Sequence, residues 1–241
     1  MLLAAAIAGI VLLGAVTQRI AGIGFGLVAS PLLVLLLGPL QGVVLTNVFG
    51  LATALVAVAG TIRVIEWRRI LPIAAVVAIV PGAILARAIA GPTLSVVAGC
   101  LVLAALAISV AAQRIRGLDR WPGLVAAGGL GGVMNVLAGV GGPAVTAYAI
   151  ASRWEHRAFS TSIQAYLVIV CAASLLMRGT LPTLTIVEWL AAFAALGAGV
   201  VLGQWLSRRV AARAGRIACV SVATLGGIAV IVTGSLELLG A

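Results

Sequence analysis

The sequence predicts an all-α polytopic membrane protein built from two inverted repeats, each a broken helical hairpin followed by three transmembrane helices. Two observations carry this prediction: 63 % of the 241 residues are hydrophobic while only 8 % are charged, and a glycine cluster recurs at a constant offset of 117 residues. A water-soluble protein needs more charge, because its surface must be hydrated. The whole chain, residues 1–241, is therefore predicted to be a single membrane domain.

Eight apolar stretches divide the chain, and six of them have the length of about 20 residues that a helix needs to cross about 30 Å of hydrocarbon. They cover about residues 2–38, 41–62, 70–90, 93–113, 121–151, 158–177, 183–206 and 217–239. The first and the fifth are too long for one crossing and carry the glycine clusters. Each could be a long kinked helix, a helical hairpin that turns at membrane depth, or two short crossings.

The arginines select among these alternatives. All 15 basic residues are arginines, against five acidic residues. If each long stretch crossed once, the loop arginines would divide seven against seven; if each returns to the side it entered from, twelve lie on one side and only Arg87 and Arg178 on the other. Arginine-rich loops stay in the cytoplasm. The second arrangement is therefore predicted, with repeat one at about 1–115, repeat two at about 120–241 and both termini outside.

The glycine clusters are the predicted binding site. Ala21 to Gly24 matches Ala138 to Gly141, and a proline follows each cluster. A turn at membrane depth must be buried in protein or line a cavity, because lipid cannot satisfy its backbone groups. Paired broken helices at corresponding positions of two halves indicate a transporter's binding site. The predicted backbone ligands are Gly22, Gly24, Gly26, Gly139, Gly141 and Gly142, with close helix packing as the alternative role.

Polar side chains within the apolar stretches complete the predicted site, because they could donate hydrogen bonds to a bound anion. They are Thr46, Asn47, Asn135, Thr161, Ser162, Gln164 and Arg19. The alternative role of the hydroxyls and amides is hydrogen bonding between helices. Arg19 is a candidate partner for an anion because it lies at membrane depth, although its guanidinium could instead extend to the headgroups.

Other functions find little support in the sequence. No nucleophile arrangement, metal-ligand cluster or nucleotide-binding loop occurs, so we predict neither an enzyme nor a cofactor nor a metal. The net charge of +10 would suggest nucleic acid in a soluble protein, but these arginines lie between membrane segments. Cys100, Cys171 and Cys219 stand singly in apolar stretches and are expected to be buried thiols.

At these residues the sequence resembles the TauE/SafE sulfite-exporter family. The resemblance lies in AGIGFGLVASPLLVLLLG followed by LTN at 45–47, and in GGLGGVMNVLAGVGGPAVTAYAIA followed by STS at 160–162. It extends over essentially the whole chain as a two-part pattern. Phe25 departs from it, because a glycine is common at that position in the family.

The resemblance implies transport of a small sulfur-containing anion such as sulfite or a sulfonate. The residues themselves predict an anion-selective secondary transporter of the inner (plasma) membrane that works by alternating access. Its expected partners are a small anionic substrate and the lipid bilayer, and homo-oligomerisation is left open. The alternatives are an anion channel, a transporter of a non-sulfur small organic anion and a membrane subunit that does not transport.

Overall fold

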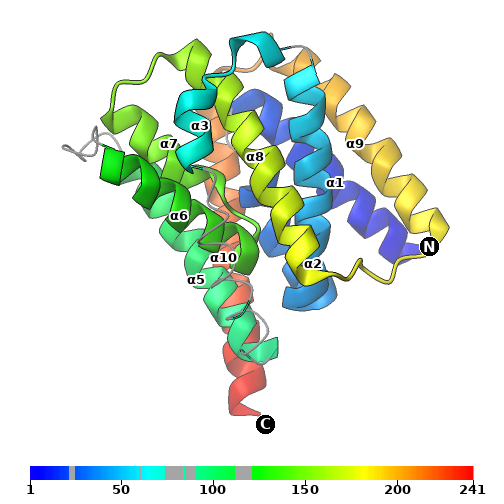
Figure 1. The fold of residues 1–241 in the computed structure, drawn as a ribbon. Coiled ribbons are helices and arrows are strands. Elements are labelled where there is room, and N and C mark those ends of the chain that lie inside the picture. The colour runs from blue at the N-terminus through cyan, green and yellow to red at the C-terminus, as the bar shows by residue number, and fades with distance from the viewer. Residues whose placement is uncertain are drawn as a thin grey trace.

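The computed structural model describes residues 1–21, 25–59, 61–73, 84, 89, 91–111 and 121–240, and this part of the chain is helical without strands (Figure 1). The helices are α1 (Leu2–Ala21), α2 (Phe25–Ala59), the 3-10 helix η1 (Ile62–Val64), α3 (Trp67–Ile73), α5 (Gly91–Ala111), α6 (Trp121–Ala138), α7 (Gly142–Ala151), α8 (His156–Arg178), α9 (Ile186–Leu206) and α10 (Ala212–Leu239). Seven described helices are long and apolar enough to cross a membrane. The predicted all-α polytopic membrane protein is confirmed.

The helical stretch α2 consists of two arms that fold back on each other. Gly38 interrupts it with φ 80° and ψ 168°, a conformation that glycine adopts readily, and Pro39 follows. A Cβ atom on Gly42 would lie 2.6 Å from the carbonyl carbon of Leu33, and nine residues of straight helix would keep these positions far apart. The first arm, 25–37, therefore belongs to the predicted stretch 2–38, and the second arm, 39–59, to the stretch 41–62.

The first arm of α2 also packs back against α1. A Cβ atom on Gly14 would lie 2.8 Å from the ring of Phe25 and 3.1 Å from the Cβ of Ala29. One apolar cluster joins these two elements, since it contains Ile7 and Val11 of α1 together with Leu33 of the first arm. The stretch 2–38 is thus two packed helices, and the residues between them, 22–24, lie outside the described part of the chain.

The second long stretch, 121–151, is broken where the glycines predict it. Helix α6 ends at Ala138 and α7 begins at Gly142. Trp121 at the start of α6 and Ser152 just after α7 line one cavity, so the two helices form a hairpin whose open end lies there. The predicted crossing over 70–90 falls mostly outside the described residues, and the division into two inverted repeats stays a prediction.

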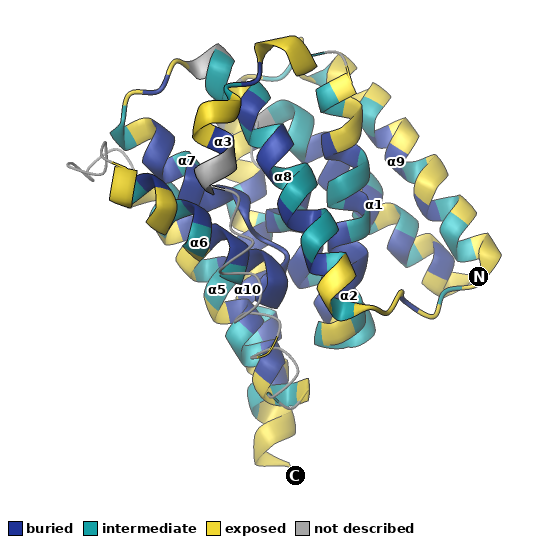
Figure 2. Ribbon diagram, in the orientation of Figure 1, coloured by how far each residue is buried: buried dark blue, intermediate teal, exposed yellow. Residues whose placement is uncertain are grey.

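The long helices pack against one another in pairs. Helix α1 packs along α9, α5 along α10, and α2 against α8. Buried residues gather where α2, α6, α7 and α8 meet, whereas the outer face of α9 and the end of α10 are exposed (Figure 2). The exposed outer side chains include Leu190, Val201 and Leu236, which are apolar. An apolar exterior around a tightly packed interior is the arrangement that a bilayer requires.

The arginine-rich segments gather at one end of the bundle. Figure 1 places η1, α3, the loop between α7 and α8 and the loop between α9 and α10 at its top, with both chain termini lower in the view. These segments contain Arg63, Arg68, Arg69, Arg153, Arg208 and Arg209. We call this side of the molecule the arginine-rich end.

Candidate functional site

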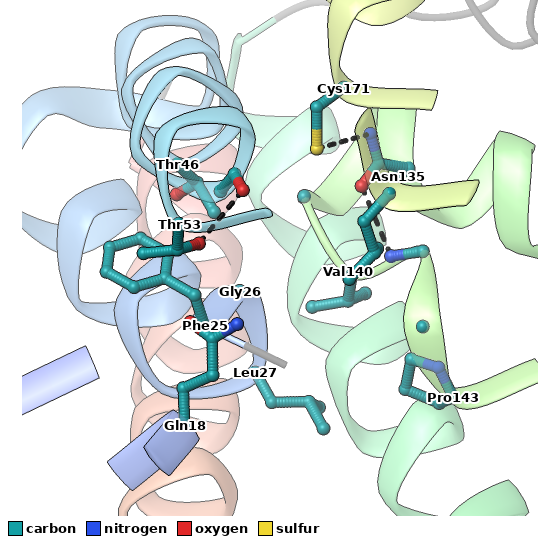
Figure 3. Close-up of a pocket in the computed structure, with 15 residues that line it drawn as sticks. Gln18, Phe25, Gly26, Leu27, Thr46, Thr53, Asn135, Val140, Pro143 and Cys171 are labelled. Carbon is teal, nitrogen blue, oxygen red and sulfur yellow. Dashed lines mark hydrogen bonds between the residues drawn. The ribbon is translucent and has the colours of Figure 1, made fainter. Parts of the chain in front are cut away.

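The interruption between α6 and α7 lies against the start of α2, and a cavity of about 30 Å³ is found at their junction. It is lined by Gln18, Phe25, Gly26, Leu27, Thr46, Gly50, Thr53, Asn135, Gly139, Val140, Gly141, Gly142, Pro143, Leu167 and Cys171 (Figure 3). These residues come from α1, both arms of α2, the α6–α7 hairpin and α8. A volume of this size holds about two water molecules or one compact small anion.

Glycine is required where the start of α2 touches the turn between α6 and α7. A Cβ atom on Gly26 would lie 1.9 Å from the carbonyl oxygen of Gly139. Gly139 itself has φ +69°, and a Cβ atom there would lie 2.9 Å from Cγ2 of Thr46. Neither position admits a side chain, the first because of backbone contact and the second because of both contact and conformation. Residues of both predicted clusters therefore meet directly, while Gly22 and Gly24 lie outside the described residues.

The turn after α6 presents the start of α7 to the cavity. The backbone N–H of Gly139 donates to the carbonyl oxygen of Asn135 at 2.8 Å, which caps α6 through a left-handed glycine. Helix α7 then begins at Gly142, with Gly141 as N-cap and no side chain capping it. A Cβ atom on the buried Gly142 would meet nothing within 4 Å, so this position borders open space. The positive end of the α7 dipole thus borders the cavity.

Asn135 is the centre of the hydrogen bonds around the cavity. Its Nδ2 donates to Asn47 Oδ1 at 2.5 Å and to Ser174 Oγ at 3.0 Å, and Val170 O lies 3.5 Å away. Its Oδ1 accepts from the backbone N–H of Gly141 at 3.2 Å. A carboxamide nitrogen carries only two hydrogens, so these acceptors compete for them. Asn135 is 1 % exposed and joins the α6–α7 hairpin to α2 and α8.

The two polar side chains of α2 that were predicted as site residues are hydrogen-bonded within their own helix. Thr46 donates to Gly42 O at 2.8 Å, and Asn47 Nδ2 donates to Val43 O at 2.9 Å. Thr46 lines the cavity, and Asn47 stands behind it as the partner of Asn135. Ser30 of the first arm adds another link between the hairpins, because its hydroxyl donates to Ala138 O.

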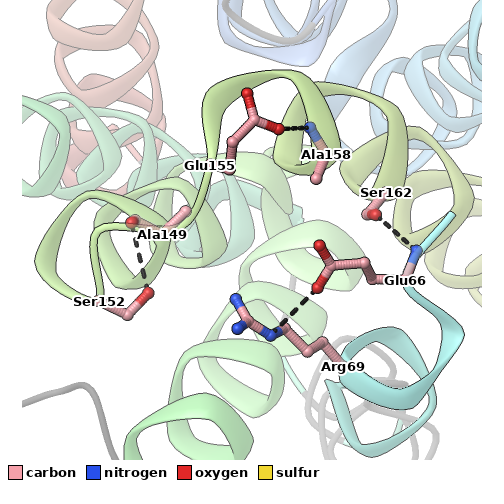
Figure 4. A network of polar contacts seen from close by, with 7 residues as sticks. All are labelled: Glu66, Arg69, Ala149, Ser152, Glu155, Ala158 and Ser162. Carbon is pink, nitrogen blue, oxygen red and sulfur yellow. Dashed lines mark hydrogen bonds and ion pairs between the residues drawn. The ribbon is translucent and has the colours of Figure 1, made fainter. Parts of the chain in front are cut away.

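Four predicted side chains lie elsewhere. Ser162 Oγ accepts from the backbone N–H of Glu66 at 3.0 Å, near the arginine-rich end (Figure 4), and Thr161 precedes it on α8. The side chain of Arg19 lies against α9, where a Cβ atom on Gly203 would be 2.8 Å from its Cβ. Gln164 is one turn from Leu167 on α8, and its Oε1 is buried without a hydrogen-bond partner among the described residues. None of these four lines the cavity.

Gln18, Thr53, Cys171 and Ser174 were not among the predicted site residues, although the first three line the cavity and the last binds Asn135. One signal could have found Gln18. The offset of 117 residues that relates the glycine clusters also relates Gln18 to Asn135, and Asn47 to Gln164. The other three have no counterpart in the repeat pattern and become visible only through helix packing.

Charge reaches the cavity indirectly. Every described residue that lines it is uncharged. Arg178, at the end of α8, approaches the network, because its guanidinium donates to Val136 O at 2.5 Å, one residue beyond Asn135. A cation at the C-terminal end of α6 is favourable because that end of the helix dipole is negative. Hydrogen-bond donors and helix dipoles therefore dominate the site.

The family described as Sulfite exporter TauE/SafE matches residues 6–230, nearly the whole chain. No curated protein and no solved structure matches the chain.

Proposed function

Because the chain belongs to the TauE/SafE sulfite exporter family, and is therefore a multi-pass membrane transporter of sulfur anions, we propose that it exports a small oxyanion such as sulfite or a sulfonate by alternating access. The anion occupies the cavity between the α6–α7 turn and the arms of α2. Thr46, Gln18 and the amides at the start of α7 bind it. Asn135 positions the turn that presents those amides.

The observation that supports this proposal most directly is the convergence of uncharged polar groups on one small cavity. Burying an anion costs free energy unless hydrogen bonds replace its hydration shell. The N-terminus of α7 supplies backbone donors and a positive dipole, and Thr46 and Gln18 supply side-chain groups. A volume of about 30 Å³ suits the compact anionic group of such a substrate.

A site with no arginine among its described lining residues also suits a transporter, because substrate must leave as readily as it enters. A buried guanidinium paired with an anion would hold it more tightly than neutral donors. An inside-negative potential would favour export by about 2.3 kcal/mol per charge per 100 mV. Export without a coupling ion is therefore energetically allowed.

Orientation belongs to the same proposal. The arginine-rich end faces the cytoplasm, and both termini lie outside, because positively charged loops are retained inside. Reporter fusions after residues 66, 117, 155 and 212 should all report the cytoplasm. Fusions at 155 and 212 that reported the outside would contradict the hairpin arrangement.

The function is tested by flux in proteoliposomes and by ligand-dependent stability. Sulfite flux should saturate and show counterflow, whereas flux that does not saturate would indicate a channel. In parallel, the purified protein is unfolded with sulfite, thiosulfate, sulfate, acetate or chloride; a ligand at about 100 times its Kd should add about 2.7 kcal/mol to stability. Stabilisation by acetate alone would contradict a sulfur substrate. The variant Thr46→Val keeps the shape and should lose the response.

A further inference from the structure

A second, larger cavity lies at the arginine-rich end. It has a volume of about 250 Å³ and is lined by Arg68, Arg69, Trp121, Leu124, Tyr148 and Ser152. These residues belong to α3, to the start of α6 and to the end of α7, so the cavity lies at the open end of the α6–α7 hairpin. It shares no lining residue with the site described above.

The cavity carries one uncompensated positive charge among the described residues. Arg69 is held in place. Its Nε lies 3.2 Å from Glu66 Oε2 (Figure 4), and its guanidinium lies over the Trp154 ring, 4.7 Å from the centroid. Arg68, its neighbour on α3, forms no ion pair with any described residue. Two arginines and one glutamate therefore leave a guanidinium available to an anion.

A tyrosine hydroxyl points to the same kind of ligand. Tyr148 lines the cavity, and its hydroxyl forms no hydrogen bond with another residue in the described part of the chain. This hydroxyl can therefore donate to a ligand in the cavity. Ser152 lies beside it and donates to Ala149 O at 3.3 Å, a long contact that its hydroxyl can exchange for a better acceptor. Both hydroxyls suit an oxyanion.

The surroundings of the cavity are those of a membrane interface. Trp121 is 62 % exposed, Trp67 on α3 is also exposed, and Val125 continues an apolar surface along α6. Tryptophans are enriched at headgroup level, where one part of the ring is apolar and the other wet. Basic pockets between membrane helices bind anionic lipid headgroups. We propose that this cavity binds the phosphodiester group of an anionic phospholipid.

Size and chemistry favour a lipid over a free anion. The cavity has about 250 Å³, far more than a free oxyanion fills, and an exposed tryptophan beside it can pack against an acyl chain. A lipid bound there would join α3 to the α6–α7 hairpin. This proposal concerns lipid binding and does not depend on the transported substrate.

The test measures lipid binding to the full-length, delipidated protein in detergent by native mass spectrometry. Phosphatidylglycerol should bind in preference to phosphatidylcholine. Arg68→Gln should weaken phosphatidylglycerol binding about five-fold, as expected for one arginine near an anionic headgroup. Tyr148→Phe, which keeps the ring, should also weaken it. Arg209→Gln is the matched control, because Arg209 lies over the Trp205 ring in another loop of the same end, 4.0 Å from the centroid, and should bind like wild type.

Three results would overturn the proposal. Equal binding of the two lipids would exclude a headgroup site. Unchanged phosphatidylglycerol binding in both Arg68→Gln and Tyr148→Phe would place the lipid elsewhere. Complete displacement of phosphatidylglycerol by millimolar inorganic phosphate would identify a site for free anions instead. Sulfite transport is measured separately, and its failure would leave the lipid result unaffected.

Discussion

Two carboxamides line the cavity at matching positions: Gln18 near the tip of the hairpin of α1 and α2, and Asn135 near the tip of the hairpin of α6 and α7. Their surroundings differ. Asn135 in the second tip is 1 % exposed and bonds Asn47, Ser174 and Gly141. Gln18 precedes the first interruption, is half-buried and lines the same cavity, yet its carboxamide forms no hydrogen bond with another described residue. One amide therefore holds the structure together, and the other is available to a ligand.

This difference separates two kinds of polar group that look alike in a membrane sequence. A network that joins three elements must break before those elements move, whereas a group without partners can bind substrate at no cost to packing. If the halves are inverted repeats, the two carboxamides should exchange roles when the transporter opens to the opposite side of the membrane. Gln18 would then pair with Gln164, and Asn135 would lose its partners.

The largest effect is expected where the tips touch. In Gly26→Ala the new Cβ would lie 1.9 Å from the backbone carbonyl oxygen of Gly139, which cannot move aside as a side chain could. We expect a stability loss of about 3 kcal/mol, at the upper end of overpacking effects, and loss of transport. Denaturant unfolding in detergent measures the first and proteoliposome flux the second. Gly9→Ala, with no atom within 4 Å of the new Cβ, is the control and should retain stability.

Asn135→Ala should be the next most damaging change. It leaves Asn47 Oδ1 and the backbone N–H of Gly141 buried without this partner. In water-soluble proteins each such loss costs about 1–3 kcal/mol of stability. Because membrane hydrogen bonds average about 0.6 kcal/mol, we expect a total near 2 kcal/mol. Thr233→Val, which removes a hydroxyl bonded only within its own helix, should change unfolding little. Equal unfolding of both variants would refute the central role of Asn135.

Gly142→Ala separates binding from folding. The new Cβ meets no atom within 4 Å, so the fold accepts it, and it would extend into the space at the start of α7. We expect KM for sulfite to rise about ten-fold, as for one methyl group in a tight site. Stability should change by less than about 0.5 kcal/mol, because alanine suits a helix better than glycine. Unchanged KM would mean that the anion binds away from this end of α7.

The smallest effect is expected at Gln18, the carboxamide that forms no hydrogen bond with another described residue. Gln18→Ala removes no hydrogen bond seen among the described residues, so stability should hold while transport falls a few-fold. A double-mutant cycle with Gln164→Ala asks whether the two carboxamides meet during transport. Coupling above about 0.5 kcal/mol in the transport rate, without coupling in stability, is the expected outcome. Strict additivity in both measurements would argue against the exchange of partners.

Much of the fold could be predicted from local properties of the chain. The break between α6 and α7 follows from clustered glycines before Pro143, and the fold-back of α2 from Gly38–Pro39, because these residues favour conformations or lack donors that a helix needs. Helix α9 begins where Thr185 and Glu188 form a capping box, with Thr185 N–H donating to Glu188 Oε2 at 2.7 Å. Such signals act within a few residues and need no tertiary contact.

The site was predicted less completely. Thr161 and Ser162 were predicted because they are polar residues within an apolar stretch, but Ser162 accepts from the backbone N–H of Glu66 near the arginine-rich end. The partner that Asn135 uses on α8 is Ser174, three turns further along. Apart from a few polar residues such as Thr46, Asn47 and Thr53, α2 is apolar around its circumference, so its sequence does not reveal which neighbouring helix each side meets.

By itself, the sequence determined that this protein lies in a membrane, that its helices have spanning length and that glycines break two of its long stretches. Bilayer thickness, the demand for backbone hydrogen bonds and the conformational freedom of glycine decide those features along the chain. Only the tertiary structure decided that Gly26 touches Gly139, that Asn135 binds Asn47 and that Arg19 lies against α9. Those contacts depend on how helices far apart in sequence rotate and cross, which is set by the complementary shapes of packed side chains.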